Sequence, residues 1–414
     1  MISCKKINWT WMNIPPKITA VFNLLTGVLH AIDGSPKVQS FANFKCPQPL
    51  KVRGSPPKPQ ERNHTKALSE RQMTMDMEQD RQWISEKINI GKEAWYMTQD
   101  EVISTGLTEE EILQLTKEAL VAHGNKQYEM PAKIGVHPRQ EVFFHAMPAY
   151  VPSKLALGMK WIECYPNNPS QFKLPQTTGL MLLNDPLSGC PIAIMDCAWI
   201  TAMRTPAVTV LAAAALHPDA ETFGMFGCGV QGIEHVKYVV HTLKKLKKIY
   251  IYDIKEEFMN QLIASVPPEI AAKIIKGKHY EEVTKACEVL SSATFIVKKP
   301  YSFVKYDWVS KGQTILPCDL NTFWDPVIAK KADKFIVDSI EEHELFAGAG
   351  YFPDGLPKIA CETGEILAGL KKGREAASEL IVCSNIGMSV CDVVVAREIF
   401  NRALVKGLGR KLPL

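Results

Sequence analysis

The sequence lacks the cysteine spacing that marks a metal centre or a disulfide-rich fold. Its eleven cysteines are scattered singly, with no C-x-x-C pair and no His/Cys cluster at the spacing of metal ligands. We therefore expect no bound metal. Isolated cysteines also favour reduced thiols, which are typical of a cytoplasmic protein.

Most of the chain also lacks a strong charge of either sign. The formal net charge of +4 comes from residues 1–66, where ten Lys/Arg face two acids, Asp33 and Glu61. The remaining 348 residues hold 38 basic and 42 acidic groups. Such a mildly acidic body presents no basic surface to a phosphate backbone, so no nucleic-acid partner is expected.

The N-terminal segment lacks sustained helical or strand periodicity, and eight of the 27 prolines fall within residues 1–66. Its apolar run, Ile18–Ile32, has 15 residues, fewer than the roughly 20 that span a bilayer, so no membrane partner is expected. Basic residues before this run are typical of a targeting peptide, but no small-residue cleavage site stands out. We expect residues 1–92 to be a disordered or upstream extension outside the catalytic body. Organellar targeting by residues 1–66 stays open as the alternative to a cytoplasmic location.

The most informative motif that is present runs from Gly227 to Gly232 and has the form G-x-G-x-x-G. An apolar strand, Thr222–Phe226, is expected before it and a helix after it. Gly227 allows a tight turn, Gly229 lets the backbone approach a pyrophosphate, and Gly232 lets the helix pack closely on the strand. The motif therefore predicts a dinucleotide-binding site.

The helix that starts at Val230 and Gln231 offers unpaired N–H groups and the positive end of its dipole to the phosphates. The next predicted strand, Ile249–Tyr252, ends on Asp253, 21 positions after the last glycine. A carboxylate there accepts hydrogen bonds from both ribose hydroxyls and repels a 2′-phosphate, so the cofactor is expected to be NAD rather than NADP. Lys255, two residues later, is the one element that would weaken this preference.

Two capping boxes mark the first elements of the body. Thr98 with Glu101 and Thr108 with Glu111 each place a hydroxyl and a carboxylate three residues apart, a pattern that begins helices. The second box heads a helix predicted over Glu109–Gly124, and a strand-rich region follows. The strands expected in this region are Glu141–His145, Ala156–Ile162, Thr178–Asn184 and Pro191–Asp196, with a hairpin turn at Asp185–Gly189. A short strand, Ala94–Met97, is expected before the first capping box.

Helices and strands alternate from the glycine motif onward, which predicts an α/β domain with a mostly parallel, doubly wound sheet. A helix over Trp199–Leu216 leads into the motif, and the last helix, Val390–Leu404, is expected to return to the first domain. Between them we expect strands at Ile274–Ile275, Glu288–Ser291, Gln313–Leu316 and Phe335–Asp338, and helices at Glu256–Val266 and Tyr280–Cys287.

Several short blocks occur in a specific order between about Ala94 and Leu408. In order and spacing they resemble the ornithine cyclodeaminase/mu-crystallin family. The blocks are Met130-Pro-Ala-Lys133, Met147-Pro148, Gly158-Met-Lys160-Trp161, Thr201-Ala-Met-Arg204-Thr205, the glycine motif, Cys318-Asp319, Thr363–Gly369, and Asn385-Ile-Gly387 through Asp392.

The resemblance implies a Rossmann-type NAD(P)-binding domain beside a strand-rich α+β domain that binds substrate and forms a homodimer. It places the substrate domain at 93–208, completed by 385–414, and the Rossmann domain at 209–384. The implied chemistry is hydride transfer at the α-carbon of a small amino or imino acid. In ornithine cyclodeaminases the amine is oxidised to an imine, cyclisation expels ammonia, and reduction of the ring imine gives proline and regenerates NAD.

The side chains of the matched blocks suit an amino-acid substrate. Arg204 can clamp a carboxylate with two parallel hydrogen bonds, and by the resemblance it also contacts the cofactor. Lys160 lies in an apolar strand, where burial would lower the pKa of its ammonium enough for proton exchange with the substrate amine, so it is a catalytic as well as a binding candidate. Lys133 stands where the family usually has an arginine. It and Met147 are expected at the substrate.

Asp319 follows a strand at the carboxyl edge of the sheet, where ligands of open α/β folds bind. It is expected to be catalytic, either holding the substrate ammonium or taking a proton from the amine. Thr178, Ser292 and Thr294 are expected to line the cofactor.

Two departures from the ornithine enzymes leave the substrate open. Phe323 and Trp324 follow Asp319, where those enzymes have a small glycine-containing turn and a lysine. His145 stands where they tend to have an acid near the distal amine of the substrate. The alternatives to a cyclodeaminase are a ketimine reductase, an amino-acid or opine-type dehydrogenase, and a mu-crystallin-like binding protein with little turnover.

Overall fold

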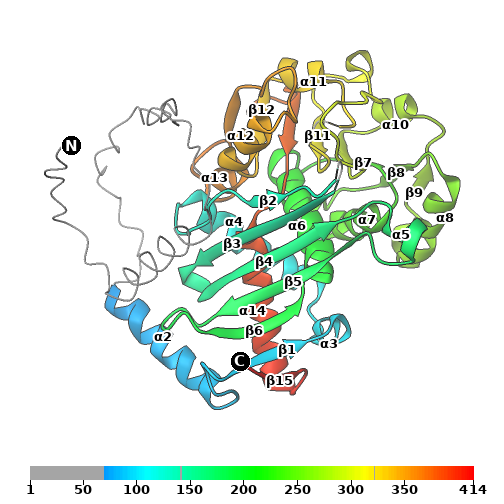
Figure 1. The fold of residues 1–414 in the computed structure, drawn as a ribbon. Helices are drawn as coiled ribbons and strands as arrows, with labels where there is room; N and C mark the ends of the chain where they lie inside the picture. The colour runs from blue at the N-terminus through cyan, green and yellow to red at the C-terminus, as the bar shows by residue number, and fades with distance from the viewer. Residues whose placement is uncertain (1–69, 140–141, 321) are drawn as a thin grey trace, which may run out of the picture. The chain divides into compact units, whose positions relative to one another are not determined.

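The computed structural model describes residues 70–139, 142–320 and 322–414. The expectations for the 1–66 segment, including the run Ile18–Ile32, fall outside these residues. The described part belongs to one compact unit, residues 67–414. It contains two β-sheets with helices packed between and around them (Figure 1). The expected combination of a Rossmann-type domain with a second, strand-rich domain is confirmed.

The first sheet has seven strands in the order β15-β1-β6-β5-β4-β3-β2. Its neighbours pair antiparallel except β1 and β6, which pair parallel. On β4 the odd and even positions alternate in burial, as a sheet with one covered face requires. The strands are β1 (Glu93–Met97), β2 (Ile134–Val136), β3 (Phe143–Val151), β4 (Ala156–Cys164), β5 (Thr177–Asn184), β6 (Pro191–Asp196) and β15 (Arg410–Pro413).

One long helix near the C-terminus covers the inner face of this sheet. α14 (Ser389–Lys406) packs on β3, β4 and β5 and on α4 (Glu109–Gly124), and Figure 1 shows these strands in front of it. Both capping boxes are present, at the start of α3 (Gln99–Ser104) and of α4. The return of the last helix to the first sheet is therefore as the sequence predicts, and β15 extends that sheet by pairing with β1.

The second sheet has eight strands in the order β13-β12-β14-β11-β10-β7-β8-β9, all of them parallel. The predicted doubly wound parallel sheet is confirmed. Strand order reverses beside β7, where such folds open a crevice at the carboxyl ends of the strands. The strands are β7 (Thr222–Phe226), β8 (Lys248–Tyr252), β9 (Ile274–Lys276), β10 (Val289–Ser292), β11 (Thr314–Pro317), β12 (Lys334–Val337), β13 (Ile359–Glu362) and β14 (Ile381–Ser384).

Helices cover both faces of the second sheet. Successive residues of β11 point into different apolar clusters: Leu316 joins the core shared with the first sheet, and Ile315 joins a smaller core on the other face. α6 (Ala198–Leu216) joins the two halves by packing on α4, α7 and α14. Although α6 is long and apolar enough to cross a membrane, it is mostly buried as a core helix here. The remaining helices are α7 (Val230–Thr242), α8 (Glu256–Ser265), α9 (Pro268–Ala271), α10 (Tyr280–Ala286), α11 (Pro326–Lys331), α12 (Ile340–Gly348) and α13 (Thr363–Leu367), with the short α5 (Asn168–Phe172) in the first domain.

The expected boundary at residue 92 needs a correction. Residues 70–85 form α2 (Glu70–Ser85), and Ile84 and Ile88 are buried in the main core. Arg81 pairs with Asp185 and donates to Ser188 Oγ at 2.7 Å in the β5–β6 turn. Residues 70–92 are therefore part of the folded body. The apolar periodicity of these residues is too weak to predict α2 from the sequence. A few core contacts and ion pairs hold this helix on the body.

Candidate active site

The glycine-rich turn between β7 and α7 has the geometry that a dinucleotide needs. Gly227 has φ +88°, and a Cβ there would lie 2.7 Å from the carbonyl oxygen of Ala293. A Cβ on Gly232 would collide with the Gly227 carbonyl oxygen. At Gly229, by contrast, a Cβ would meet no atom within 4 Å. The first and third glycines thus serve close packing, and the second faces open space, where a pyrophosphate can approach the backbone.

The start of α7 adds hydrogen-bond donors to this turn. The helix begins at Val230 after Gly229, and no side chain caps its first N–H groups. Gln231 has a buried side-chain oxygen without a hydrogen-bond partner. A helix start with free N–H groups beside an open glycine is a site for phosphate oxygens. These residues therefore fit a dinucleotide.

Asp253 lies at the end of β8 and fixes the glycine-rich turn. One carboxylate oxygen accepts from Cys228 N at 2.9 Å and the other from Lys255 N at 3.0 Å. A carboxylate has further acceptor positions, so ribose hydroxyls can still bind. The Lys255 ammonium lies 5.2 Å over the ring of Phe258 and 4.0 Å from Glu257. It is thus engaged away from the acid, which leaves the basis for the NAD preference intact.

Asp319 lies just beyond β11 and is completely buried. Its Oδ1 accepts from Ser292 Oγ at 2.7 Å, and its Oδ2 accepts from the amide and hydroxyl of Thr294 at 3.1 and 2.6 Å. Burial raises the pKa of Asp319, although these hydrogen bonds oppose the rise. Ser292 and Thr294, expected at the cofactor, therefore hold the candidate catalytic carboxylate. A further bond, from Trp324 Nε1 to Ser292 Oγ at 2.7 Å, supports this group.

Lys160 and Arg204 meet at a second buried carboxylate, Asp392. Lys160 Nζ lies 2.8 Å from Asp392 Oδ2, and Arg204 Nε donates to Asp392 Oδ1 at 2.8 Å. The three residues come from β4, α6 and α14, and each is at most 4% exposed. Asp392 is the last residue of the matched block that begins at Asn385, and no role was predicted for it. Its position in the first turn of an apolar helix, where a charge needs a partner, was the available indication.

The three charges shift one another's protonation. Burial, with the neighbouring Arg204 cation, lowers the pKa of Lys160 to about 8. Burial would raise the pKa of Asp392, but Arg204 and Lys160 hold it below its ordinary value. The cluster therefore contains a permanent anion, a permanent cation and an ammonium that can lose its proton near neutral pH.

Arg204 keeps donors for a ligand. Its Nη1 is buried and has no hydrogen-bond partner among the residues that the structure describes. Gly387, which has φ +91°, packs against the guanidinium so closely that a Cβ would collide with Nη1. A buried guanidinium nitrogen without an acceptor is costly, and a substrate carboxylate would satisfy it.

Lys133 lies near this cluster, but its ammonium already has partners within the protein. Its ammonium donates to the carbonyl oxygen of Gly387 at 3.1 Å and lies 3.6 Å from Glu342 Oε2. Gly387 is held from the other side, where its amide donates to Asp338 Oδ2 at 2.6 Å. In this structure Lys133 thus supports the segment that packs on Arg204.

The other predicted residues fall into two groups. Met147 is buried on β3 directly opposite Lys160, and His145 lies two residues before it on the same face. Burial, with Lys133 nearby, lowers the pKa of His145 to about 3, so its ring is neutral. Thr178, in contrast, is the second residue of β5, and its hydroxyl donates to Glu163 of β4. Its expected place at the cofactor therefore stays a prediction.

A parallel sheet with a glycine-rich turn, together with a buried cluster of Lys160, Arg204 and Asp392 from β4, α6 and α14, defines a class of two-domain dinucleotide-dependent proteins. A model of the ornithine cyclodeaminase/mu-crystallin family matches residues 93–407, and the chain belongs to this family.

Relatives and solved structures agree with this assignment. The chain is 29% identical to an alanine dehydrogenase of Archaeoglobus fulgidus over 330 residues, which cover 77% of this chain and 98% of that protein. Its fold is similar to that of Thermococcus litoralis Δ1-pyrroline-2-carboxylate reductase in complex with NADH and L-proline, with TM-score 0.68 and 25% identity over 76% of this chain and 99% of the other. An archaeal alanine dehydrogenase dimer with bound NAD gives TM-score 0.67 and 28% identity over 77% and 99%.

Proposed function

We propose that the protein is an NAD-dependent oxidoreductase that interconverts an amino acid and the corresponding imino acid at the α-carbon. The observation that carries this proposal is the buried Lys160–Asp392–Arg204 cluster with its unpartnered guanidinium nitrogen. The comparisons support it, because two similar proteins named above act on alanine and on a cyclic imino acid.

The substrate carboxylate binds at Arg204. Asp392 holds the Nε side of the guanidinium, which leaves Nη1 directed to a second anion. Thr209, five residues further along α6, lies 3.0 Å from Cys318 Sγ, next to Asp319. Since a helix rises 1.5 Å per residue, Arg204 and the end of β11 are about 7.5 Å apart along α6. The substrate is therefore proposed to lie between Arg204 and Asp319, with its α-carbon turned toward the dinucleotide.

Lys160 and Asp319 are the two groups that exchange protons with the substrate nitrogen. Lys160, whose pKa is about 8, can take a proton from the substrate ammonium or return it to the imine nitrogen. Asp319, whose pKa is raised, holds the nitrogen on the opposite side or exchanges the second proton. NAD supplies the hydride acceptor, and NADH the hydride donor, when bound at the glycine-rich turn. The fit of the turn and the position of Asp253 support NAD as the cofactor.

The side chains around His145 favour an uncharged substrate side chain. His145 is neutral, stacks on Phe143 at 4.2 Å and meets the edge of Phe346 at 6.3 Å. Within residues 70–139, 142–320 and 322–414, the charges that act on His145 are those of Lys133, His137 and Lys160, and none of them is a carboxylate. We therefore place a dehydrogenase or cyclic-imine reductase ahead of ornithine cyclodeamination.

One observation favours cyclodeamination as the second candidate. Glu342 is buried on α12, and its Oε2 lies 3.6 Å from the Lys133 ammonium but accepts no hydrogen bond from the described residues. This oxygen can accept from a distal amine of a diamino acid, in place of the acid that is missing at His145. Glu342→Gln would then weaken turnover of ornithine or lysine and spare alanine. Glu341→Gln, on the exposed side of the same helix, is the matched control.

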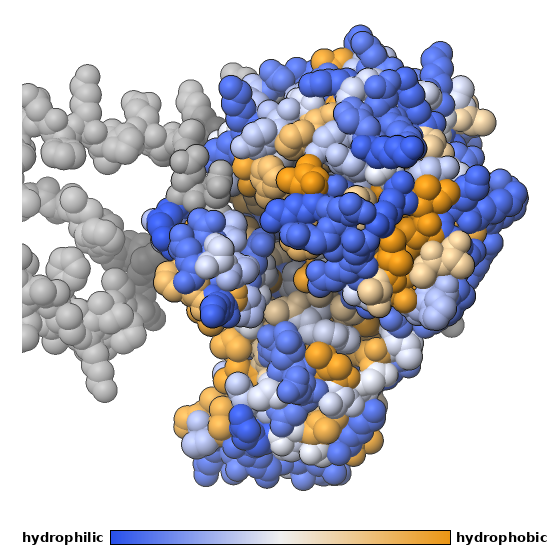
Figure 2. Space-filling view, turned by 90° about the vertical axis from the view of Figure 1, so that its right-hand side faces the viewer, coloured by the Kyte–Doolittle hydropathy of each residue, from blue (hydrophilic) through white to orange (hydrophobic). Residues whose placement is uncertain are grey.

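We also propose that the chain forms a homodimer through the outer face of the first sheet. Side chains on this face alternate with those that contact α14, and no helix is drawn over it in Figure 1. Trp161 and Leu180 are 38% and 43% exposed there, beside Phe144, Met159 and Leu182. On the side shown in Figure 2, by contrast, hydrophobic residues form separate patches between hydrophilic ones. Trp161→Glu with Leu180→Asp should give a monomer in sedimentation, and Val405→Asp, at an exposed position near the end of α14, should not.

A substrate panel tests the proposed activity. Purified full-length protein is mixed with NAD or NADH and with alanine, ornithine, lysine, or pyrroline or piperideine carboxylate, while NADH absorbance and ammonia are followed. A net change in NADH with alanine or a cyclic imine supports the first candidate. Ammonia release without net NADH supports cyclodeamination. Absence of turnover with the whole panel contradicts both and favours a binding protein.

A further inference from the structure

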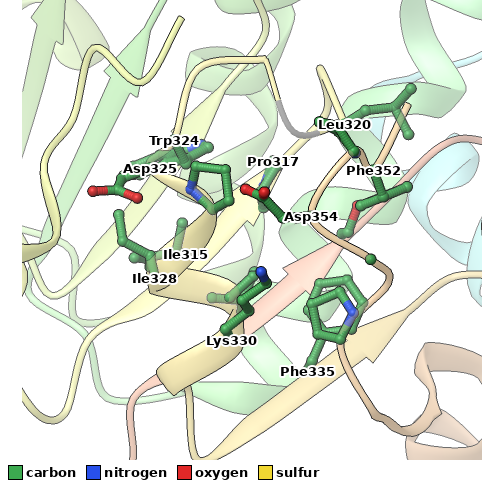
Figure 3. Close-up of a pocket in the computed structure, with 17 residues that line it drawn as sticks. Ile315, Pro317, Leu320, Trp324, Asp325, Ile328, Lys330, Phe335, Phe352 and Asp354 are labelled. Carbon is green, nitrogen blue, oxygen red and sulfur yellow. The ribbon is translucent and has the colours of Figure 1, made fainter. Parts of the chain in front are cut away.

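A cavity lies beside β11 on the side of α11, and Trp324 is the one residue that it shares with the candidate active site described above. Residues of β11, β12, β14, α11 and the 352–357 loop line it (Figure 3). Its walls are mainly apolar. They include Ile315, Leu320, Trp324, Ile328, Phe335 and Phe352. Such a wall suits a hydrocarbon or aromatic group.

Two opposite charges face this cavity. Figure 3 shows Lys330 and Asp354 reaching toward the same space from opposite sides, whereas the carboxylate of Asp325 points away. Asp325 is occupied as the N-cap of α11, where it accepts from Val327 N at 3.0 Å. Within the described residues, Lys330 and Asp354 form no ion pair with each other or with another side chain. In the part of the chain that the structure describes, the apolar cavity is therefore lined by one unpaired cation, Lys330, and one unpaired anion, Asp354.

The cavity is connected to the candidate catalytic carboxylate through one side chain. Trp324 forms part of the wall, and its indole N–H donates to Ser292 Oγ at 2.7 Å. Ser292 Oγ in turn donates to Asp319 Oδ1 at 2.7 Å. A ligand that moves the indole ring therefore changes the hydrogen bonding of Asp319.

We propose that this cavity is a second binding site for a free amino acid with an apolar side chain, and that its occupancy adjusts the active site through Trp324. The side chain of the ligand packs on the aromatic wall. Its carboxylate binds Lys330 and its ammonium binds Asp354. Both groups sit on one carbon, so the ligand bridges two protein charges that do not reach each other. The binding is independent of the proposed function, and only its effect on turnover rests on that function.

Calorimetry tests the binding with L-phenylalanine and L-leucine on the full chain without NAD. Phenylacetate lacks the ammonium and phenethylamine lacks the carboxylate, so each should bind about tenfold more weakly or worse than phenylalanine. Equal binding of either analogue, or no binding of both amino acids at millimolar concentration, overturns the proposal.

Variants locate the binding. Ala329→Trp fills the cavity, and Val327→Trp places the same ring on the same helix at an exposed position that does not line it. Lys330→Gln removes the surface cation with little risk to folding. Ala329→Trp should abolish binding and Val327→Trp should keep it. Lys330→Gln should weaken binding about tenfold. Arg204→Lys, which weakens carboxylate binding in the active site, should leave it unchanged. Loss in this variant would instead assign the binding to the active site.

Fluorescence and turnover test the coupling. Phenylalanine should change the tryptophan emission of the wild-type protein, and Trp324→Phe should remove this change while keeping the binding. The ligand should alter kcat or KM of the wild type, and the effect should disappear in Trp324→Phe. Binding with no effect on turnover refutes the coupling. If no substrate is turned over, the proposed function fails, and calorimetry still decides the site.

Discussion

Two buried carboxylates, Asp392 and Asp319, are held in opposite ways. Asp392 forms ion pairs with two cations, Lys160 and Arg204, which lower its pKa. Asp319 accepts only from neutral donors of Ser292 and Thr294, and burial raises its pKa. The comparison teaches that burial alone does not decide whether an acid stays charged, because the charge of its partners does.

The difference assigns different tasks to the two acids. A carboxylate between two cations stays ionised and fixes their positions, so Asp392 is a counter-ion that orients Arg204 and Lys160. A carboxylate among neutral donors can change its protonation at modest cost, so Asp319 suits proton exchange. The same substitution, Asp to Asn, separates the two roles.

Asp319→Asn should lower turnover by about 10²–10⁴-fold, the usual size of an acid–base contribution. The Asn amide keeps the volume but cannot exchange the proton. NADH affinity, measured by fluorescence titration, should stay within about twofold, because the glycine-rich turn is untouched. Turnover equal to that of the wild type would remove Asp319 from the mechanism.

Asp392→Asn should act mainly on stability. It leaves two buried cations without a counter-ion, which costs about 3–5 kcal/mol of unfolding free energy. Urea unfolding monitored by circular dichroism measures this loss. Asp319→Asn in the same assay is the matched control, and it should cost about 1–2 kcal/mol, since only hydrogen bonds change. Equal losses at the two positions would refute the assigned difference.

The residues that bind the cofactor were predictable because they lie close together in the sequence. Gly227, Gly229, Gly232 and Asp253 belong to one strand–helix–strand unit, and each glycine has a local steric reason. The two capping boxes were predictable for the same reason.

The substrate half was predicted only in part. Lys160 and Arg204 were expected, but their partner Asp392 lies 188 residues after Arg204, and no local pattern pairs them. The bond of Lys133 to Gly387 likewise depends on how α14 returns to the first sheet. Ser292 and Thr294 were expected to line the cofactor, but their hydrogen bonds to Asp319 follow from the parallel pairing of β10 with β11. Long-range pairing of this kind has no signature in a single sequence.

Lys160 is the partner of Asp392 that can change its protonation state near neutral pH, so the activity should depend on pH. Its pKa of about 8 predicts that kcat/KM for amine oxidation rises about tenfold per pH unit below 8 and levels off above it, because the neutral amine is the base. Imine reduction should show the reverse dependence. Lys160→Arg, which cannot lose its proton near this pH, should leave little activity and no such inflection. An unchanged inflection in this variant would assign the titration to another group.

Asp253 is the third acid of the site and the least buried of the three, so its substitution should have the smallest effect. Asp253→Ala removes the acceptor for the ribose hydroxyls and the repulsion of a 2′-phosphate, and the ratio of kcat/KM for NAD over NADP should fall about tenfold or more. Because Asp253 also accepts from Cys228 N and Lys255 N, looser packing of the turn would weaken both cofactors alike. Asp253→Asn, which keeps one acceptor for the turn and loses the charge, separates the two effects. A ratio that is unchanged in both variants would place the ribose elsewhere.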